Sequence, residues 1–336
     1  MCKTNHFLVL SYYMKKRLLS GVKPTGAPHI GNYFGAMRQF VNLQDEYEAF
    51  IMIADYHALN FIQNKKEMEE NIINVTLDYL GIGLDPEKVT IFKQSDISAH
   101  TELAWIFDTI TTMPYLMRAH AYKDAEAKNK EISVGTFNYP MLMAADILLY
   151  DPEIVPVGSD QKQHVEYARD TAQKFNNIYG ETFLMPKAMI MPDVATIPGT
   201  DGQKMSKSYK NTIPLFASDE EIKKAVMSIV TDSKTPDESK DPETCNIFSL
   251  HKLFLPGESL ENLRSRYIKG GLGYKESKEL LLEEILKLVT PMRERRDMYA
   301  KDLDKVRKIL NNGKDKARII AENKMNIVRN NIGVNL

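Results

Sequence analysis

The sequence contains little cysteine and no excess of either charge. Cys2 and Cys245 are the only cysteines among 336 residues, which excludes a disulfide framework and a cysteine-rich zinc site and fits a reducing cytosol. Lys and Arg number 44 against 45 Asp and Glu, so a global basic signal for nucleic acid is absent and only a local patch could supply one. Phe7–Leu10 is too short an apolar run to span a membrane, and no small-residue cleavage site follows it. We therefore expect no targeting segment and a cytoplasmic protein.

The first residues are expected to be dispensable. Met14 is followed by Lys-Lys-Arg-Leu-Leu, which is a more natural start, so residues 1–13 are predicted to be an extension. The length suggests two domains, and 43% hydrophobic with 26% charged residues is ordinary for a globular protein with ample core.

Strand and helix patterns alternate through the first half of the chain. Strands are expected at four compact apolar runs: residues 17–19, 50–54, 89–92 and 154–157. With helical patterns between them, they indicate an α/β fold with a parallel sheet and right-handed crossovers. Ligands bind beyond the carboxyl ends of such strands. Asp55, His57 and Gln94 fall at strand ends, so they could line one crevice.

The stretch from Ser20 to Asn32 joins the first strand to a helix. Gly26 and Gly31 let the backbone approach a ligand closely, and His29 and Asn32 offer donors at the start of the helix. A helix N-terminus suits a phosphate, because its backbone N–H groups are unpaired and its dipole end is positive. The spacing matches neither the dinucleotide-binding glycine motif nor the ordinary P-loop. The alternative is a tight strand-to-helix connection that binds nothing.

Asp146 lies within residues 139–150, a segment that is apolar nearly all round and predicts a buried helix. A buried carboxylate without a partner is costly, so another group must pair with it or donate a hydrogen bond to it. The functional interpretation is an acceptor that selects a polar atom on an otherwise apolar ligand. The alternative is a structural role, either as an internal cap or in an ion pair with an arginine.

The fourth apolar run leads into Gly158-Ser159-Asp160-Gln161, a second junction of strand, glycine and helix. Asp160 is well placed as a helix N-cap. It could have that role alone, or it could lie with Gln161 beside a ligand at the same end of the sheet.

The segment Gly202-Gln203-Lys204-Met205-Ser206-Lys207-Ser208 is a flexible cationic loop with two hydroxyl groups. A surface loop is easily written with these residues, but the order Lys-Met-Ser-Lys-Ser is not expected by chance after a His-Ile-Gly-Asn stretch. Together the two segments resemble the paired signature of the class I aminoacyl-tRNA synthetases. Within that class, Ser-Gly-Val-Lys-Pro-Thr-Gly, Met-Ala-Ala-Asp-Ile-Leu-Leu-Tyr and Val-Gly-Ser-Asp-Gln-Lys-Gln-His are similar to the bacterial tryptophanyl-tRNA synthetases. The resemblance runs from about residue 16 to the C-terminus and is densest between residues 20 and 211.

The resemblance implies a Rossmann-like catalytic domain over residues 14–212 and an all-helical anticodon-binding domain over residues 213–336, whose last helix could pack back on the first domain. It implies an enzyme that joins tryptophan to ATP, releases pyrophosphate, and transfers the acyl group to the 3′ end of tRNA(Trp). The substrate carboxylate attacks the α-phosphorus, so no side-chain nucleophile is needed. Catalysis would consist of positioning and of neutralising charge on the phosphates.

The family pattern also implies residue roles at the matching positions. Catalytic roles would fall on His29, Asn32, Lys204, Lys207 and Ser208, and the two lysines would close over the leaving pyrophosphate. The rest of the ATP site would comprise Lys23, Pro24, Thr25, Gly31, Gly158, Ser159, Asp160, Ile197, Met205 and Ser206. Mg²⁺ would be held by phosphate oxygens and water rather than by protein ligands.

Tryptophan recognition would centre on Asp146, because an indole N–H is only a donor and suits a carboxylate acceptor in an apolar pocket. The other contacts would come from Tyr139 and Gln161 at the α-amino group and from Met143, Val155 and Val157 around the ring. Each of the last three could equally be plain core.

The sequence departs from the family pattern at a few positions. Lys23 stands where the family often has Gln, and Leu19 where some relatives carry an aromatic residue. A mobile lysine of the family matches either Lys123 or Lys128.

After residue 211 the sequence predicts helices. Ser218 and Glu221 form a capping box, residues 231–244 read as a loop, and Lys and Arg outnumber Asp and Glu over residues 293–329. That excess is either a solvated helical face or, by resemblance, part of a surface for tRNA. The resemblance further implies a homodimer. A tyrosine-specific relative and a non-enzymatic paralogue are the competing interpretations.

Overall fold

The computed structural model describes residues 15–127, 131–158, 162–189 and 197–335. The extension predicted at residues 1–13 lies outside the described residues, as do Lys128, Ser159, Asp160 and Gln161.

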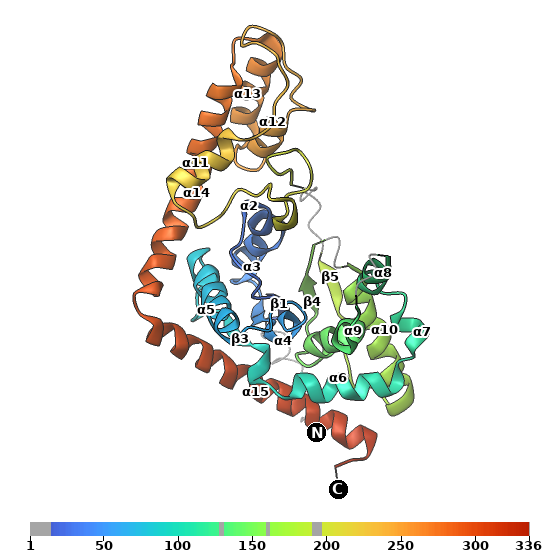
Figure 1. Ribbon diagram of the computed structural model, residues 1–336. Coiled ribbons are helices and arrows are strands. Elements are labelled where there is room, and N and C mark those ends of the chain that lie inside the picture. The colour runs from blue at the N-terminus through green and yellow to red at the C-terminus, as the bar shows by residue number, and fades with distance from the viewer. Residues whose placement is uncertain (1–14, 128–130, 159–161, 190–196, 336) are drawn as a thin grey trace, which may run out of the picture.

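A five-stranded parallel sheet forms the centre of the molecule (Figure 1). The strands are β1 Arg17–Val22, β2 Glu48–Ile53, β3 Thr90–Lys93, β4 Ile154–Pro156 and β5 Lys187–Met189, in the order β3-β2-β1-β4-β5. The chain moves outward from β1 to β3 and then crosses to the other side of β1 for β4 and β5. The strand order thus reverses between β1 and β4, where α/β sheets open a crevice at the carboxyl ends. Four strands coincide with predicted ones, whereas the three-residue β5 was not predicted.

Alternate residues of the strands enter two separate cores, because successive side chains of a strand point to opposite faces. The first core contains Leu18, Ile51, Ile53 and Ile91, and the second contains Leu19, Phe50, Met52 and Phe92. Every one of these side chains is at most 6% exposed. The sheet is therefore covered on both faces, as parallel sheets require.

The helices of the first half cover these two faces. The elements that pack into the first core are α2 Ile30–Asn32, the π-helical segment Tyr33–Met37, α3 Arg38–Leu43 and α5 Lys65–Gly81. Those that pack into the second core are α6 Ala99–Ile110, α9 Val134–Leu148 and α10 Lys162–Tyr179. Three short helices complete this half: α4 Asp55–Ala58, α7 Met113–Leu116 and α8 His120–Ala127. Trp105 in α6 is 70% exposed, because Leu103 and Phe107 form the buried face of the helix.

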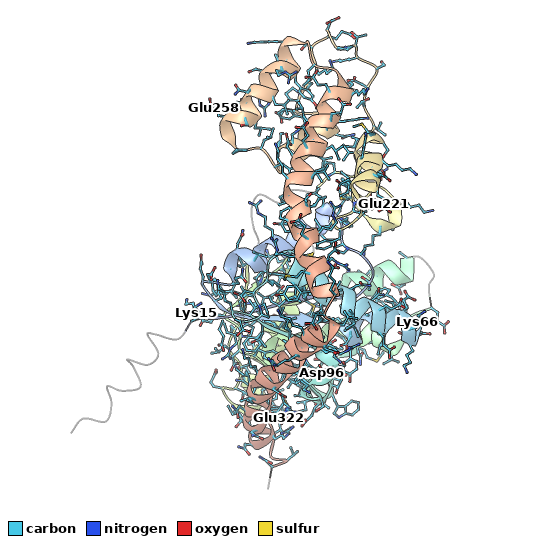
Figure 2. All side chains as sticks on the ribbon, turned by 90° about the vertical axis from the view of Figure 1, so that its left-hand side faces the viewer. Lys15, Lys66, Asp96, Glu221, Glu258 and Glu322 are labelled. Atoms are coloured by element: carbon cyan, nitrogen blue, oxygen red, sulfur yellow. The ribbon has the colours of Figure 1, made fainter. Side chains whose placement is uncertain are left out.

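Residues 219–332 form five helices: α11 Asp219–Met227, α12 Asn246–His251, α13 Gly257–Lys269, α14 Tyr274–Ala300 and α15 Leu303–Ile332. The predicted capping box is confirmed, since the Ser218 hydroxyl accepts from the Glu221 N–H and the Glu221 carboxylate accepts from the Ser218 N–H. A small third core of Phe248, Leu263, Tyr267 and Leu272 lies at the far tip of the molecule. Figure 2 shows α14 running from this tip, near the labelled Glu258, toward α15, which carries Glu322.

Helix α15 returns to the sheet and packs across β3. Val306 and Leu310 belong to the first core, whereas Ala317, Ala321, Met325 and Val328 belong to the second. At the crossing lies Gly313, where an added Cβ would stand 1.8 Å from the Ile91 carbonyl oxygen. None of the helices in the described ranges combines the length and the apolar character needed to cross a membrane. The division into two domains at residues 212 and 213 stays a prediction.

We predict that Gly313→Ala destabilises the protein. Alanine has a higher helix propensity than glycine, by about 1 kcal/mol, but the backbone of β3 occupies the position of the new methyl group. Overpacking of this kind should lower the free energy of unfolding by about 1–3 kcal/mol or more, measured by urea unfolding. Gly257→Ala is the matched control, because nothing lies within 4 Å of its added Cβ. Equal stability of the two variants would contradict the close crossing.

Candidate active site

The junction after β1 enters α2 through a reciprocal cap between His29 and Asn32. The Asn32 N–H donates to His29 Nδ1 at 3.3 Å, and the His29 N–H donates to Asn32 Oδ1 at 3.1 Å. His29 is 7% exposed, and burial, together with the Lys207 ammonium, lowers its pKa to about 4. The cap itself needs an unprotonated Nδ1, so the imidazole is neutral at neutral pH and carries its proton on Nε2.

The two signature segments lie in contact with each other. The Gly31 N–H points at Met205 Sδ, 3.3 Å away. A Cβ on Gly31 would stand 2.9 Å from His29 Nδ1 and 3.3 Å from Met205 Cβ, so this approach needs glycine. The backbones pair nearby, with Ile30 N–H donating to Ile213 O at 2.9 Å and Leu215 N–H to Pro28 O at 3.1 Å.

Lys207 reaches from the second segment back to the loop after β1. Its ammonium donates to the carbonyls of Thr25 at 2.9 Å and Gly26 at 3.0 Å. Gly26 has a φ of +86°, which favours glycine at this turn. Burial lowers the pKa of Lys207, and the negative charge of Asp78 opposes that shift.

Asn211 determines the shape of the Lys-Met-Ser-Lys-Ser loop. Its side chain is 2% exposed, its Oδ1 accepts from the Ser206 N–H at 2.8 Å, and its Nδ2 donates to Asp201 Oδ1 at 2.7 Å and to Lys204 O at 3.1 Å. The hydroxyls of Ser206 and Ser208 lie 2.9 Å apart. The loop was expected to be flexible, but its backbone is hydrogen-bonded at two points to one buried amide.

Asp146 is 2% exposed in α9, and its carboxylate accepts hydrogen bonds from three side chains. His57 Nε2 lies 2.8 Å from Oδ2, His100 Nδ1 lies 2.7 Å from Oδ1, and Gln94 Nε2 lies 2.8 and 3.0 Å from the two oxygens. Burial alone would raise the pKa of Asp146, but the hydrogen bonds from His100 and His57 outweigh it and lower the pKa to about 2. An ionised carboxylate only accepts, so both histidine nitrogens carry protons. The ion pair with an arginine that the sequence left open is therefore wrong.

The Asp146 cluster is tied to the ends of the neighbouring strands. Gln94 follows β3, and its Oε1 accepts from the Tyr56 N–H at 3.1 Å and the His57 N–H at 3.4 Å. His100 Nε2 lies 2.9 Å from the hydroxyl of Tyr150. The sequence pointed to His57 and Gln94 as strand-end residues. It gave no signal for His100, because its contact with Asp146 depends on how α6 crosses α9.

Of the other residues expected to bind tryptophan, two share helix α9 with Asp146 and two lie in the second core. Tyr139, Met143 and Asp146 share one face of α9 by their spacing, and the first two are half-buried. The Tyr139 ring packs edge-to-face on His57 with centroids 6.2 Å apart. Val155 is buried and Val157 half-buried in the same core as Met143. Gln161 lies outside the described residues.

The remaining residues of the expected ATP site are divided between surface and core. Pro24 is buried, whereas Lys23, Thr25 and Lys204 are exposed. Ile197 and Met205 are 7% and 4% exposed in the first core. Gly158 is half-buried just after β4, close to the place where the Ser20 hydroxyl of β1 donates to Pro156 O at 3.1 Å. Lys23 Nζ lies 4.8 Å from the centroid of the Phe61 ring.

Comparisons with known proteins agree with this arrangement. The model of the class I tRNA synthetases for W and Y matches residues 14–290. The tryptophan–tRNA ligase of Fusobacterium nucleatum is 49% identical over 320 residues, 95% of this chain and 98% of that protein. The one from Rhodopirellula baltica is 47% identical over 318 residues, 95% and 99% of the two chains. The crystal structure of tryptophanyl-tRNA synthetase from Campylobacter jejuni, complexed with ADP and tryptophan, has a TM-score of 0.87 at 46% identity and covers 94% of this chain and 99% of its own.

A parallel sheet that carries these two signature segments in contact is the catalytic fold of a class I aminoacyl-tRNA synthetase. The relatives that match nearly the full chain are tryptophan–tRNA ligases, which identifies the kind of synthetase within that class. The chain belongs to the bacterial tryptophanyl-tRNA synthetases.

The buried neutral His29 should make stability depend on pH. An unfolded histidine has a pKa near 6.5, so the folded value of about 4 means that the unfolded chain binds more protons between these values. His29 therefore contributes stability that is complete above pH 6.5 and falls as the pH drops toward 4, by about 3 kcal/mol in total. We expect the unfolding free energy of the wild type minus that of His29→Asn, which keeps a capping side chain, to shrink over this window. Urea unfolding at stepped pH measures it, and a constant difference would contradict the prediction.

Proposed function

We propose that this protein activates tryptophan with ATP, giving tryptophanyl-adenylate and pyrophosphate, and then transfers tryptophan to the 3′ end of tRNA(Trp). The observation that carries the proposal is the contact of Gly31 with Met205, which brings the two signature segments together at the crevice between β1 and β4. The near-full-length likeness to bacterial tryptophan–tRNA ligases supports tryptophan over tyrosine as the substrate.

On the ATP side, the chain's own groups would position and neutralise the phosphates. We assign contacts with the phosphates to Thr25, His29, Asn32 and the two signature lysines. A neutral His29 with its proton on Nε2 can donate to a phosphate oxygen without adding charge beside Lys207. Lys207 would leave the carbonyls of Thr25 and Gly26 for the β- and γ-phosphates, which develop charge as pyrophosphate departs.

On the tryptophan side, we assign the indole N–H to Asp146. The carboxylate is already satisfied by three donors, so the ligand must join or displace one of them. His57 is the candidate for displacement, because it is 8% exposed whereas Gln94 and His100 are fully buried. Tyr139 would meet the α-amino group, and Met143, Val155 and Val157 would pack against the ring.

Mg²⁺ would share the phosphate charge and favour departure of pyrophosphate. Within the described residues no group of three or more His, Cys, Asp or Glu side chains is placed to hold a metal ion. The groups around the signature segments are lysines, hydroxyls and a neutral imidazole. This donor set fits an ion held by phosphate oxygens and water.

The remaining assignments follow from the family. We propose that the helices after residue 213 bind the anticodon of the tRNA, that the protein is a homodimer, and that it acts in the cytoplasm. Exposed apolar side chains on α6, α7 and α9, namely Trp105, Met113 and Val134 at 63–75% exposure, support a contact with a second copy.

The purified protein should exchange pyrophosphate into ATP when tryptophan is present and not when tyrosine or phenylalanine replaces it. Such exchange reports the reversible activation step without tRNA. Exchange with tyrosine alone would favour the tyrosine-specific alternative. Failure with all three amino acids would favour a non-enzymatic paralogue.

Asp146→Asn and Lys207→Ala should damage different parameters of this exchange. Asp146→Asn removes a charged acceptor, which is worth about 1.5–3 kcal/mol, so the KM for tryptophan should rise by roughly 10- to 100-fold. Lys207→Ala removes a donor to the leaving group, so kcat should fall by roughly 100-fold with little change in the KM for tryptophan. Equal loss of every parameter in both variants would count against these roles.

A further inference from the structure

His164 lies in the first turn of α10 and is bonded to Tyr139 of the neighbouring helix α9. The two helices lie side by side (Figure 1), and the Tyr139 hydroxyl is 2.6 Å from His164 Nε2. The two rings are also in contact, with centroids 5.4 Å apart. His164 ends the segment Val-Gly-Ser-Asp-Gln-Lys-Gln-His, which is part of the family resemblance, but it has none of the roles proposed above. The bond therefore connects an unassigned histidine to a residue of the proposed tryptophan site.

The Tyr139 ring lies beyond the carboxyl ends of the strands. It packs edge-to-face on His57, which follows β2, with centroids 6.2 Å apart. His57 Nε2 in turn donates to Asp146 Oδ2 at 2.8 Å. Helix α10 follows β4, so its first turn, with His164, begins at the same edge of the sheet. A chain of contacts thus runs from His164 through Tyr139 and His57 to the carboxylate that we assign to the indole N–H.

The alternative is that the bond only fastens α9 to α10. Both helices already contribute buried apolar side chains to the second core, among them Met141, Ala144 and Leu148 from α9 and Val165, Ala168 and Ala172 from α10. Tyr139 and His164 are each half-buried. Since the apolar core already holds the helices together, the position of the bond beside His57 favours a role at the ligand.

We propose that His164 is a positioning residue for tryptophan, which accepts the proton of the Tyr139 hydroxyl so that the oxygen faces the α-ammonium group as an acceptor. The inference rests on the proposed function, in which Tyr139 meets that group. A tyrosine hydroxyl has one proton and can also accept, whereas an ammonium group only donates. A hydroxyl whose proton points at His164 Nε2 keeps its lone pairs for the ligand. The imidazole then carries its own proton on Nδ1.

The test uses two competitors of tryptophan in ATP–pyrophosphate exchange with the full chain. Tryptamine keeps the amino group and lacks the carboxylate, whereas indolepropionate keeps the carboxylate and lacks the amino group. His164→Ala should raise the KM for tryptophan and the inhibition constant of tryptamine by roughly 10-fold, with little change in kcat. The inhibition constant of indolepropionate should stay at its wild-type value, because this competitor presents no ammonium group to Tyr139.

Two further variants separate positioning from packing. His164→Gln keeps an acceptor close to the position of Nε2, so the inhibition constant of tryptamine should stay within about 2-fold of the wild-type value. In a Tyr139→Phe background the hydroxyl is gone, so His164→Ala should add no further loss of tryptamine binding. Such non-additivity is expected when one residue acts through the other.

Asp170→Ala is the matched control. Asp170 also belongs to α10 and also accepts from a tyrosine hydroxyl, that of Tyr115, with its Oδ2 at 2.7 Å. Tyr115 belongs to α7 rather than to α9. The inhibition constants of both competitors should therefore match the wild type in this variant.

Equal weakening of both competitors in His164→Ala would overturn the inference, because a loss of packing affects the whole ligand. Additive effects of His164→Ala and Tyr139→Phe, or a His164→Gln variant as weak as His164→Ala, would overturn it as well. Should His164→Ala fail to fold, His164→Leu takes its place, since leucine fills the space and offers no acceptor. A wild-type protein that shows no exchange with tryptophan would instead refute the proposed function.

Discussion

The site depends on one close approach, between the Gly31 N–H and the sulfur of Met205 across 174 residues of chain. A side chain at position 31 would run into His29 and Met205. The approach is maintained by the backbone pairing of residues 28–30 with residues 213–215, so it does not rely on side-chain packing alone. Only because the two segments meet can Lys207 reach the carbonyls of Thr25 and Gly26.

The candidate site holds a cation at Lys207 and an anion at Asp146, and hydrogen-bonding neighbours support each of them. A protonated His29 would lose its cap to Asn32 and repel Lys207, and its low pKa avoids both penalties. Asp146 in turn stays ionised although buried, because His57, His100 and Gln94 donate to it. A buried charge is tolerated only when it is paired or fully hydrogen-bonded. The fold thus holds an ammonium at Lys207 and a buried carboxylate at Asp146, the two charges that the proposed binding of ATP and tryptophan would use.

The sequence predicted what is local and periodic, and it missed what depends on packing between distant elements. Four strands were visible in the sequence as compact apolar runs, and in the structure their successive residues, such as Leu18 and Leu19, enter opposite cores. The signature segments were visible as ordered motifs, although their residue roles stay predictions. A contact such as that of His100 with Asp146 could not be found, because neither spacing nor composition says which helices cross. The three residues of β5 were too few to form a pattern.

Helix α15 covers one edge of the sheet, and a two-residue connection joins it to α14. β3 is an edge strand, and an open edge offers unpaired backbone groups to other chains. Helix α15 covers it, and Gly313 permits the helix to lie almost on the Ile91 carbonyl. Only Lys301 and Asp302 separate α15 from α14, so the helix that seals the edge also fixes where Arg296 meets Asp78. A displacement of α15 from β3 would therefore also pull on the hydrogen bonds by which Arg296 holds α14 to α5.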